Sequence, residues 1–176
     1  MLLPILPPLR QSLRTLDEDM ALIRELGANA VRLAHYQHNQ YFYDLCDETG
    51  LVLWAEIPYI TTHLPNGKEN TIQQMKELII QNYNHPSICV WGLSNEITIS
   101  TKDKKDMMDN HRVLNDLVHE MDPSRLTTLA CYSVCGPFNP VAHKVSDIVS
   151  WNLYLGWYVP GMFLNELWGD FFHKVH

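Results

Sequence analysis

The chain has 176 residues and a formal net charge of −7, from 13 Lys and Arg against 20 Asp and Glu. This acidic balance excludes an electrostatic nucleic-acid binder, which needs a concentrated basic face. Hydrophobic residues make up 46% and charged residues 19%, which is typical of a folded domain rather than a disordered chain. No apolar run reaches the roughly 18 residues of a membrane-spanning helix. We therefore expect one folded domain that binds neither nucleic acid nor membrane.

The cysteines are spread along the chain and form neither a disulfide framework nor a zinc pattern. They are Cys46, Cys89, Cys131 and Cys135. The apolar, proline-rich residues 1–9 lack the basic start and the small-residue cleavage site of a signal peptide. Both features favour a cytoplasmic location, whereas a leader ahead of these residues would make the protein periplasmic or secreted. Residues 1–14 are assigned no role.

Helix and strand patterns alternate along the rest of the chain. The first helix is predicted to begin at a capping box, Thr15–Glu18, and to end at Gly27. Its apolar residues recur at helical spacing, at Leu16, Met20, Ile23 and Leu26. Short apolar runs predict strands over residues 29–33, 51–57, 87–93, 126–131 and 147–152. Further helices are predicted over residues 39–50, 70–83, about 107–121 and 162–175.

Strands that alternate with crossover helices predict a parallel sheet, because tight hairpins cannot join parallel neighbours. A doubly wound sheet usually carries a nucleotide-binding turn, but the eight glycines form neither G-x-G-x-x-G nor a P-loop. Polar residues instead follow the predicted strands at their carboxyl ends, where barrel enzymes keep their chemistry. These residues are Arg32, His35, Glu56, Asn95, Glu96, Asn152 and Tyr154. The α/β barrel is therefore the favoured architecture.

The most specific motif is the stretch 84–96, which reads Asn-His-Pro-Ser-Ile-Cys-Val-Trp-Gly-Leu-Ser-Asn-Glu. It resembles the acid/base signature of glycoside hydrolase family 2, the family of β-galactosidases, β-glucuronidases and β-mannosidases. Three more segments agree with that family in order and spacing, at residues 27–36, 43–56 and 152–158. The resemblance covers about residues 15–176 and implies a catalytic domain with the (β/α)8 TIM-barrel fold.

The resemblance also implies a retaining reaction with two carboxylates, an acid/base and a nucleophile. Glu96 matches the acid/base, and its alternative is a solvated acid at a helix N-terminus. Asn95 matches the asparagine whose amide reaches the sugar 2-hydroxyl. Arg32 matches an arginine that orients the nucleophile, and an ion pair with Glu56 is compatible with that role. Glu56 and Asn152 match supporting positions.

Other positions match substrate-binding residues of the family. His35 and His63 match hydroxyl-binding histidines of the β-galactosidase branch, although single histidines are more often satisfied loop or core residues. Tyr154 matches a tyrosine that hydrogen-bonds the nucleophile, and Trp157 fits either a sugar-stacking platform or core packing. No metal ligand is assigned, because His35 and His38 lack the Glu of an H-E-x-x-H motif. Mg²⁺ is implied by some members of the family, but its ligands find no match here.

In the family pattern, the chain supplies barrel strands two to six. The other strands and the nucleophile are expected outside residues 1–176, together with accessory β-sandwich domains in the full-length protein. We therefore expect a partial barrel that does not hydrolyse glycosides alone. The predicted function is a retaining glycosidase of β-galactosidase type that acts on oligosaccharides or glycosides. β-Glucuronidase and β-mannosidase are alternatives, and a non-catalytic carbohydrate-binding remnant is the hypothesis from another class.

Overall fold

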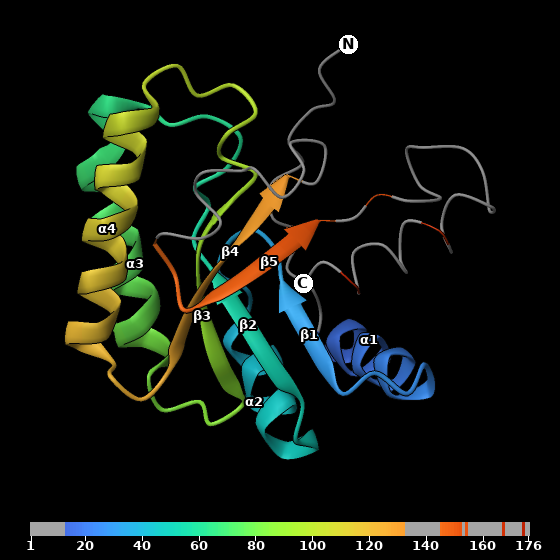
Figure 1. Cartoon of the computed structure of the whole chain (residues 1–176). Coiled ribbons are helices and arrows are strands. Elements are labelled where there is room, and N and C mark those ends of the chain that lie inside the picture. Colours follow the sequence, from blue (N-terminus) through green and yellow to red (C-terminus); the bar gives the residue numbers. More distant parts are fainter. Residues whose placement is uncertain (1–12, 133–144, 153, 155–166, 168–173, 175–176) are drawn as a thin grey trace, which may run out of the picture.

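The computed structural model describes residues 13–132, 145–152, 154, 167 and 174 (Figure 1). Within them, the strands are β1 (Ala30–Leu33), β2 (Val52–Glu56), β3 (Ile88–Asn95), β4 (Leu126–Tyr132) and β5 (Ile148–Asn152). The helices are α1 (Leu13–Glu25), α2 (Gln40–Thr49), the 3-10 turn η1 (Pro65–Gly67), α3 (Lys68–Asn82) and α4 (Lys104–Met121). The predicted strands and the helices between β1 and β4 are thus confirmed to within a few residues.

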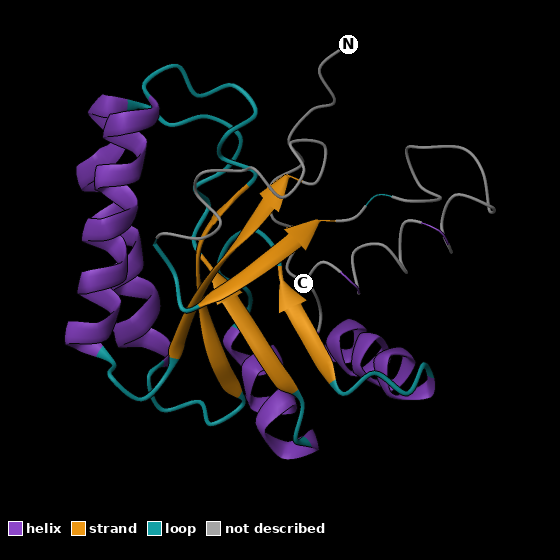
Figure 2. Ribbon diagram, viewed as in Figure 1, coloured by secondary structure: helices purple, strands orange, loops and turns teal. Residues whose placement is uncertain are grey.

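The strands form one parallel sheet in the order β1-β2-β3-β4-β5, so each strand lies beside the one before it. A doubly wound sheet reverses its strand order at a switch point, and this sheet does not. The sheet curls, and the helices that connect its strands lie on its outer face, with α3 beside α4 and α1 beside β1 (Figures 1 and 2). The incomplete TIM barrel predicted from the sequence is confirmed.

The hydrophobic core fills the layer between the sheet and the helices. Its fully buried side chains include Trp91, Leu53, Met75 and Leu114. Strands covered on both faces lose the alternation of apolar and polar residues, which explains the continuous apolar runs of β2 and β3. The outer layer holds the sheet rigid, so side chains at the strand ends project from a fixed frame.

Two predictions about the first helix need correction. Helix α1 includes Leu13, so Thr15 lies inside the helix and the predicted capping box is misplaced. The helix ends at Glu25, so Leu26 lies just beyond it and is 84% exposed, although its spacing placed it with the apolar residues of the helix. Gly27 does follow the helix with a φ of +72°, as its predicted role requires. The predicted helix 162–175 lies outside the described residues, apart from Leu167 and Lys174.

Candidate active site

The carboxyl ends of the strands meet at one rim of the sheet (Figure 2). Most of the residues predicted from the sequence converge there, since β1 ends beside β2, β3 follows, and β5 curls back toward them. The convergent set is Arg32, His35, Glu56, Asn95, Glu96, Asn152 and Tyr154, called here the rim cluster.

Arg32 joins four strands within the rim cluster. Its Nε and Nη2 atoms donate to both carboxylate oxygens of Glu56, at 2.8 and 2.9 Å. Its Nη2 and Nη1 atoms also donate to Oδ1 of Asn95 at 2.8 Å and Oδ1 of Asn152 at 2.9 Å. The guanidinium carbon lies 4.4 Å from the ring centroid of Trp54, a cation–π contact. A planar fork with five donors suits this role in a way that a lysine could not.

Glu96 directly follows β3 and turns into the rim. Its backbone has a φ of +49°, and its amide donates to the carbonyl of Ala130 at 2.8 Å. One carboxylate oxygen accepts from Nδ2 of Asn152 at 2.9 Å and from the hydroxyl of Tyr154. The residue is only 9% exposed, so the alternative of a solvated loop acid does not describe it.

The two rim carboxylates have different partners. Glu56 has a fully buried side chain that pairs with Arg32 and contacts Nδ1 of His35 at 2.8 Å. Glu96 is held by an amide and a phenol, and no cationic side chain among the described residues pairs with it. A proton donor must be free to gain and lose its proton, and a carboxylate in a bidentate ion pair is not. The geometry therefore favours Glu96 as the acid/base and Glu56 as a structural anion.

His63 lies outside the rim cluster. Burial raises the pKa of Tyr59 to about 12, so its hydroxyl stays protonated and donates to Nδ1 of His63. The other ring nitrogen, Nε2, donates to Asp106 at 2.8 Å, and the same carboxylate accepts from Lys68 at 2.7 Å. Both nitrogens are thus occupied in a side chain that is 1% exposed, which favours a satisfied core histidine over a hydroxyl-binding one.

Two aromatic positions complete the comparison with the sequence. Tyr154 was expected to contact the nucleophile, and here its hydroxyl donates to Glu96. Trp157 lies outside the described residues. The sequence analysis missed Trp54, which shares a strand face with Glu56 at the i, i+2 spacing and supports Arg32. That spacing is the signal that could have found it.

Metal-ligating side chains gather elsewhere. Among the described residues, one group has ligand geometry, formed by Asp44, Asp47 and His85 near the amino end of β3. Asp47 already binds Nδ1 of His85 at 2.6 Å and accepts from the Ser87 amide at 3.0 Å. Among the described residues, the other carboxylate of the rim cluster is Glu56, which is paired with Arg32, and Mg²⁺ binding stays a prediction.

The structure also shows where the cysteines lie and whether a helix could cross a membrane. Of the described cysteines, Cys46 and Cys131 are buried and Cys89 is exposed. Within the described residues, no helix is long and apolar enough to cross a membrane.

Comparison with known proteins agrees with this geometry. Residues 11–175 match the family model of the glycosyl hydrolases family 2 TIM-barrel domain. A β-glucuronidase of Bacteroides fragilis is 43% identical over 158 residues, which cover 81% of this chain and 21% of that protein. A β-galactosidase of Thermoanaerobacterium thermosulfurigenes is 30% identical over 140 residues, which cover 77% of this chain and 18% of that protein.

Solved structures agree as well. The crystal structure of an FMN-binding β-glucuronidase from Faecalibacterium prausnitzii L2-6 superposes with a TM-score of 0.84 at 46% identity, over 93% of this chain and 25% of that one. This chain thus spans about a fifth of the length of the curated relatives it matches. With the family model, the parallel curled sheet and the rim cluster in agreement, the chain belongs to glycoside hydrolase family 2, of whose TIM-barrel domain it carries a part.

Proposed function

We propose that this chain supplies the acid/base half of a retaining β-glycosidase, with Glu96 as the acid/base. The observation that carries the proposal is the buried position of Glu96 at the strand rim, held by Asn152 and Tyr154 beside the Arg32–Glu56 pair. In the first step, a nucleophilic carboxylate bonds to the anomeric carbon as the bond from that carbon to the glycosidic oxygen breaks, and the Glu96 carboxyl gives its proton to that oxygen. In the second step, the Glu96 carboxylate takes a proton from the water that bonds to the anomeric carbon, and the bond from that carbon to the nucleophile breaks.

The nucleophile is proposed to come from a later barrel strand of a longer protein. Glu56 does not fit that role, because both of its oxygens accept from Arg32 and one of them also contacts His35. The length of the relatives supports a longer protein, since the match to this chain covers only about a fifth of the length of each. We expect the 176-residue chain alone to release no product from any glycoside. Sequencing the DNA that flanks the coding region, and then expressing the longer gene product, provides the protein for the assays below.

For the substrate, β-glucuronides are proposed ahead of β-galactosides. The relatives at 43% and 40% identity carry β-glucuronidase names, and a solved structure at 46% identity does too. The β-galactosidase relatives at 30% and 36% identity support β-galactosides as the second candidate. Arg32 is engaged by Glu56 and is not available to read a substrate carboxylate, so that reader is expected on another segment.

A panel of 4-nitrophenyl β-glycosides tests the choice of sugar. On the longer gene product, we expect the glucuronide to have a higher kcat/KM than the galactoside, mannoside and galacturonide. A preference for the galactoside would overturn the proposed substrate and leave the role of Glu96 intact. A protein that binds these sugars and releases no product from any of them would favour the non-catalytic hypothesis.

The role of Glu96 is tested by Glu96→Gln, which keeps the shape of the side chain and removes its proton. The alcohol of an alkyl glycoside is a poor leaving group unless it is protonated, so the hydrolysis rate of these substrates should fall by about 10² to 10⁴-fold. The first step on 4-nitrophenyl glycosides should be spared, which gives a burst of nitrophenol followed by a stall. Azide needs no deprotonation and should restore turnover. Glu120→Gln, at an exposed acid on α4, is the matched control. Unchanged hydrolysis of alkyl glycosides by Glu96→Gln would refute the proposal.

A further inference from the structure

Strand β3 contains an irregularity immediately before the acid/base. On β3, Gly92 and Asn95 are three residues apart, and their partners on β4, Thr128 and Ala130, are two apart. One extra residue is therefore present on β3, which is a β-bulge. A bulge interrupts the regular ladder, so the local conformation depends on side chains that anchor it.

This bulge decides which way Asn95 faces. Trp91 points toward the helices, where its Nε1 donates to Asp122 at the end of α4, at 2.9 Å. Asn95 points the other way and accepts from Arg32 at the rim. The two residues are four apart, and a regular strand would place them on the same face. Without the extra residue, Asn95 would face the helix layer and the rim cluster would lose it.

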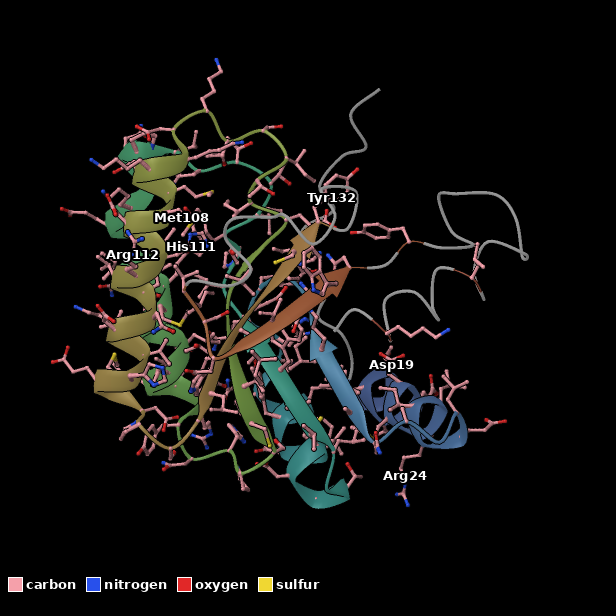
Figure 3. The ribbon with its side chains drawn as sticks, in the orientation of Figure 1. Asp19, Arg24, Met108, His111, Arg112 and Tyr132 are labelled. Carbon is pink, nitrogen blue, oxygen red and sulfur yellow. The ribbon has the colours of Figure 1, made fainter. Side chains whose placement is uncertain are left out.

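Ser94 lies in the bulge and is anchored from behind by α4, the helix on which Figure 3 labels His111. The Ser94 hydroxyl lies 2.8 Å from Nε2 of His111, and Nδ1 of His111 lies 2.8 Å from the carbonyl of Met107. A carbonyl only accepts, so Nδ1 carries the proton, and Nε2 accepts from the Ser94 hydroxyl. Both side chains are fully buried, and these hydrogen bonds satisfy polar atoms that water does not reach.

The surroundings keep His111 neutral. Burial lowers its pKa to about 4, an effect that the Met107 carbonyl opposes and the nearby His63 reinforces. The ring of Tyr59 covers the imidazole, with centroids 5.2 Å apart. The backbone carbonyl of Tyr59 also accepts from the amide of Asn95 at 2.9 Å. Tyr59 and His111 therefore hold neighbouring residues of the bulge from two sides.

We infer that Ser94 and His111 are positioning residues for the acid/base: their hydrogen bond holds the bulge that turns Asn95 toward Arg32 and Glu96 toward Asn152. The inference rests on the proposed function of Glu96. Neither residue touches the rim, so both act through the backbone of β3. Loss of the pair should misplace the proton donor while leaving the nucleophile and the sugar contacts of other strands in place.

Leaving-group dependence separates positioning from a loss of stability. On the longer gene product, rates are measured with aryl glycosides whose leaving phenols range from acidic to weakly acidic. Ser94→Ala and His111→Phe should slow the poorest leaving groups by about tenfold more than the best ones, because only the former need a well-placed proton. His111→Gln should recover much of this loss, since its amide oxygen can replace Nε2 as acceptor. A reduced amount of folded protein would lower every rate by the same factor.

Thr71→Val is the matched control. It removes another buried hydroxyl, which accepts from Asn110 on α4 at 3.2 Å and donates to the Lys68 carbonyl at 2.7 Å, so its described hydrogen bonds do not reach β3. We expect a lower stability and an unchanged leaving-group dependence. If Ser94→Ala behaves like Thr71→Val, the positioning role is refuted. If Glu96→Gln itself leaves the leaving-group dependence unchanged, the proposed function fails instead.

The hydrogen-bond arrangement can also be tested on the 176-residue chain, without activity. Nitrogen-15 spectra of the imidazole should show His111 as a neutral ring protonated on Nδ1 from pH 8 down to about pH 5. A ring protonated on Nε2, or one that titrates near its ordinary pKa of about 6.5, would overturn the inference even if the variants did not fold.

Discussion

At the amino end of the sheet, Arg125 and Asp122 form an ion pair, and at the carboxyl end Arg32 and Glu56 form another. Both arginines are partly buried, and both carboxylates are fully buried. At the amino end, the two carboxylate oxygens of Asp122 also accept from Trp91 and Ser124.

The carboxyl end differs because it contains a second buried carboxylate, Glu96, whose partners are neutral. Arg125 also donates to the carbonyls of Ile88, Tyr83 and His85, so every nitrogen of its guanidinium is engaged within the protein. A buried ion pair alone therefore does not mark an active site. The distinguishing feature is a carboxylate that the ion pair organises and does not neutralise, which agrees with the usual placement of chemistry at the carboxyl face of a barrel.

The largest expected loss of stability comes from Arg32→Met. It leaves Glu56 buried without its bidentate partner, which costs on the order of 3 to 5 kcal/mol in free energy of unfolding. Urea unfolding of the full chain measures this. The double variant Arg32→Met, Glu56→Gln should recover much of the loss, because it leaves no unpaired charge. Arg24→Met, on an exposed residue of α1 that Figure 3 labels, should change little. A single variant as stable as the wild type would mean that the rim pair is no more than a surface contact.

Gly92→Ala should cost about 3 kcal/mol, because this position allows a close approach of β2 to β3. A Cβ at Gly92 would lie 2.3 Å from Nε1 of Trp54 and 2.4 Å from Cβ of Glu56. The rim would be distorted with it, since both neighbours contact Arg32. Gly67→Ala is the control, as its nearest contact would be 3.7 Å away. Equal unfolding midpoints for the two variants would contradict this account.

These two variants also indicate what the sequence could predict. The strand positions followed from short apolar runs, and the parallel order then brought residues from distant motifs, such as Arg32 and Asn152, to one rim. The motif around Glu96 predicted that residue as the acid/base, and the structure places it buried at the same rim. The close approach at Gly92 was not predictable, because it depends on which strand lies next to β3.

The bulge in β3 was equally hidden from the sequence. Residues 87–93 form a continuous apolar run, and a run without alternation cannot reveal one extra residue. His63 shows a second limit, since the same loop position could serve a ligand or the core, and only its contacts with Tyr59 and Asp106 decide. Leu26 shows a third, because helical spacing predicts an apolar face and not what covers it.

Asp122→Asn tests the ion pair at the amino end of the sheet. Its amide nitrogen would face the donors of Arg125 or Trp91, at a cost of about 2 kcal/mol in free energy of unfolding. Burial opposes ionisation, but hydrogen bonds from Ser124, Arg125 and Trp91 outweigh it and lower the pKa of Asp122 to about 2. The stabilisation is therefore complete above the unfolded-state pKa of about 3.9 and is lost as the pH falls from there through about 2.

Urea unfolding at several pH values measures this effect. The gap between wild type and Asp122→Asn should be constant above about pH 5 and should shrink as the pH is lowered below about 4. On the longer gene product, the variant should leave the leaving-group dependence unchanged, because Asp122 lies at the end of the sheet away from Glu96. A changed leaving-group dependence would show that the two ends of the sheet are not independent.

The smallest effect is expected from Asp109→Asn, in the pair with Arg112 on α4. The two side chains are 2.6 Å apart, closer than the 2.8 Å between Arg32 and Glu56, yet they are 48% and 55% exposed. Water screens an exposed pair, and its formation costs side-chain entropy, so the loss should be about 0.5 kcal/mol or less and should vanish in high salt. A loss as large as that of Arg32→Met would mean that distance, and not burial, sets the strength of these pairs. A negligible loss of stability for Asp109→Asn would show that burial, rather than distance, makes the Arg32–Glu56 pair the stronger of the two.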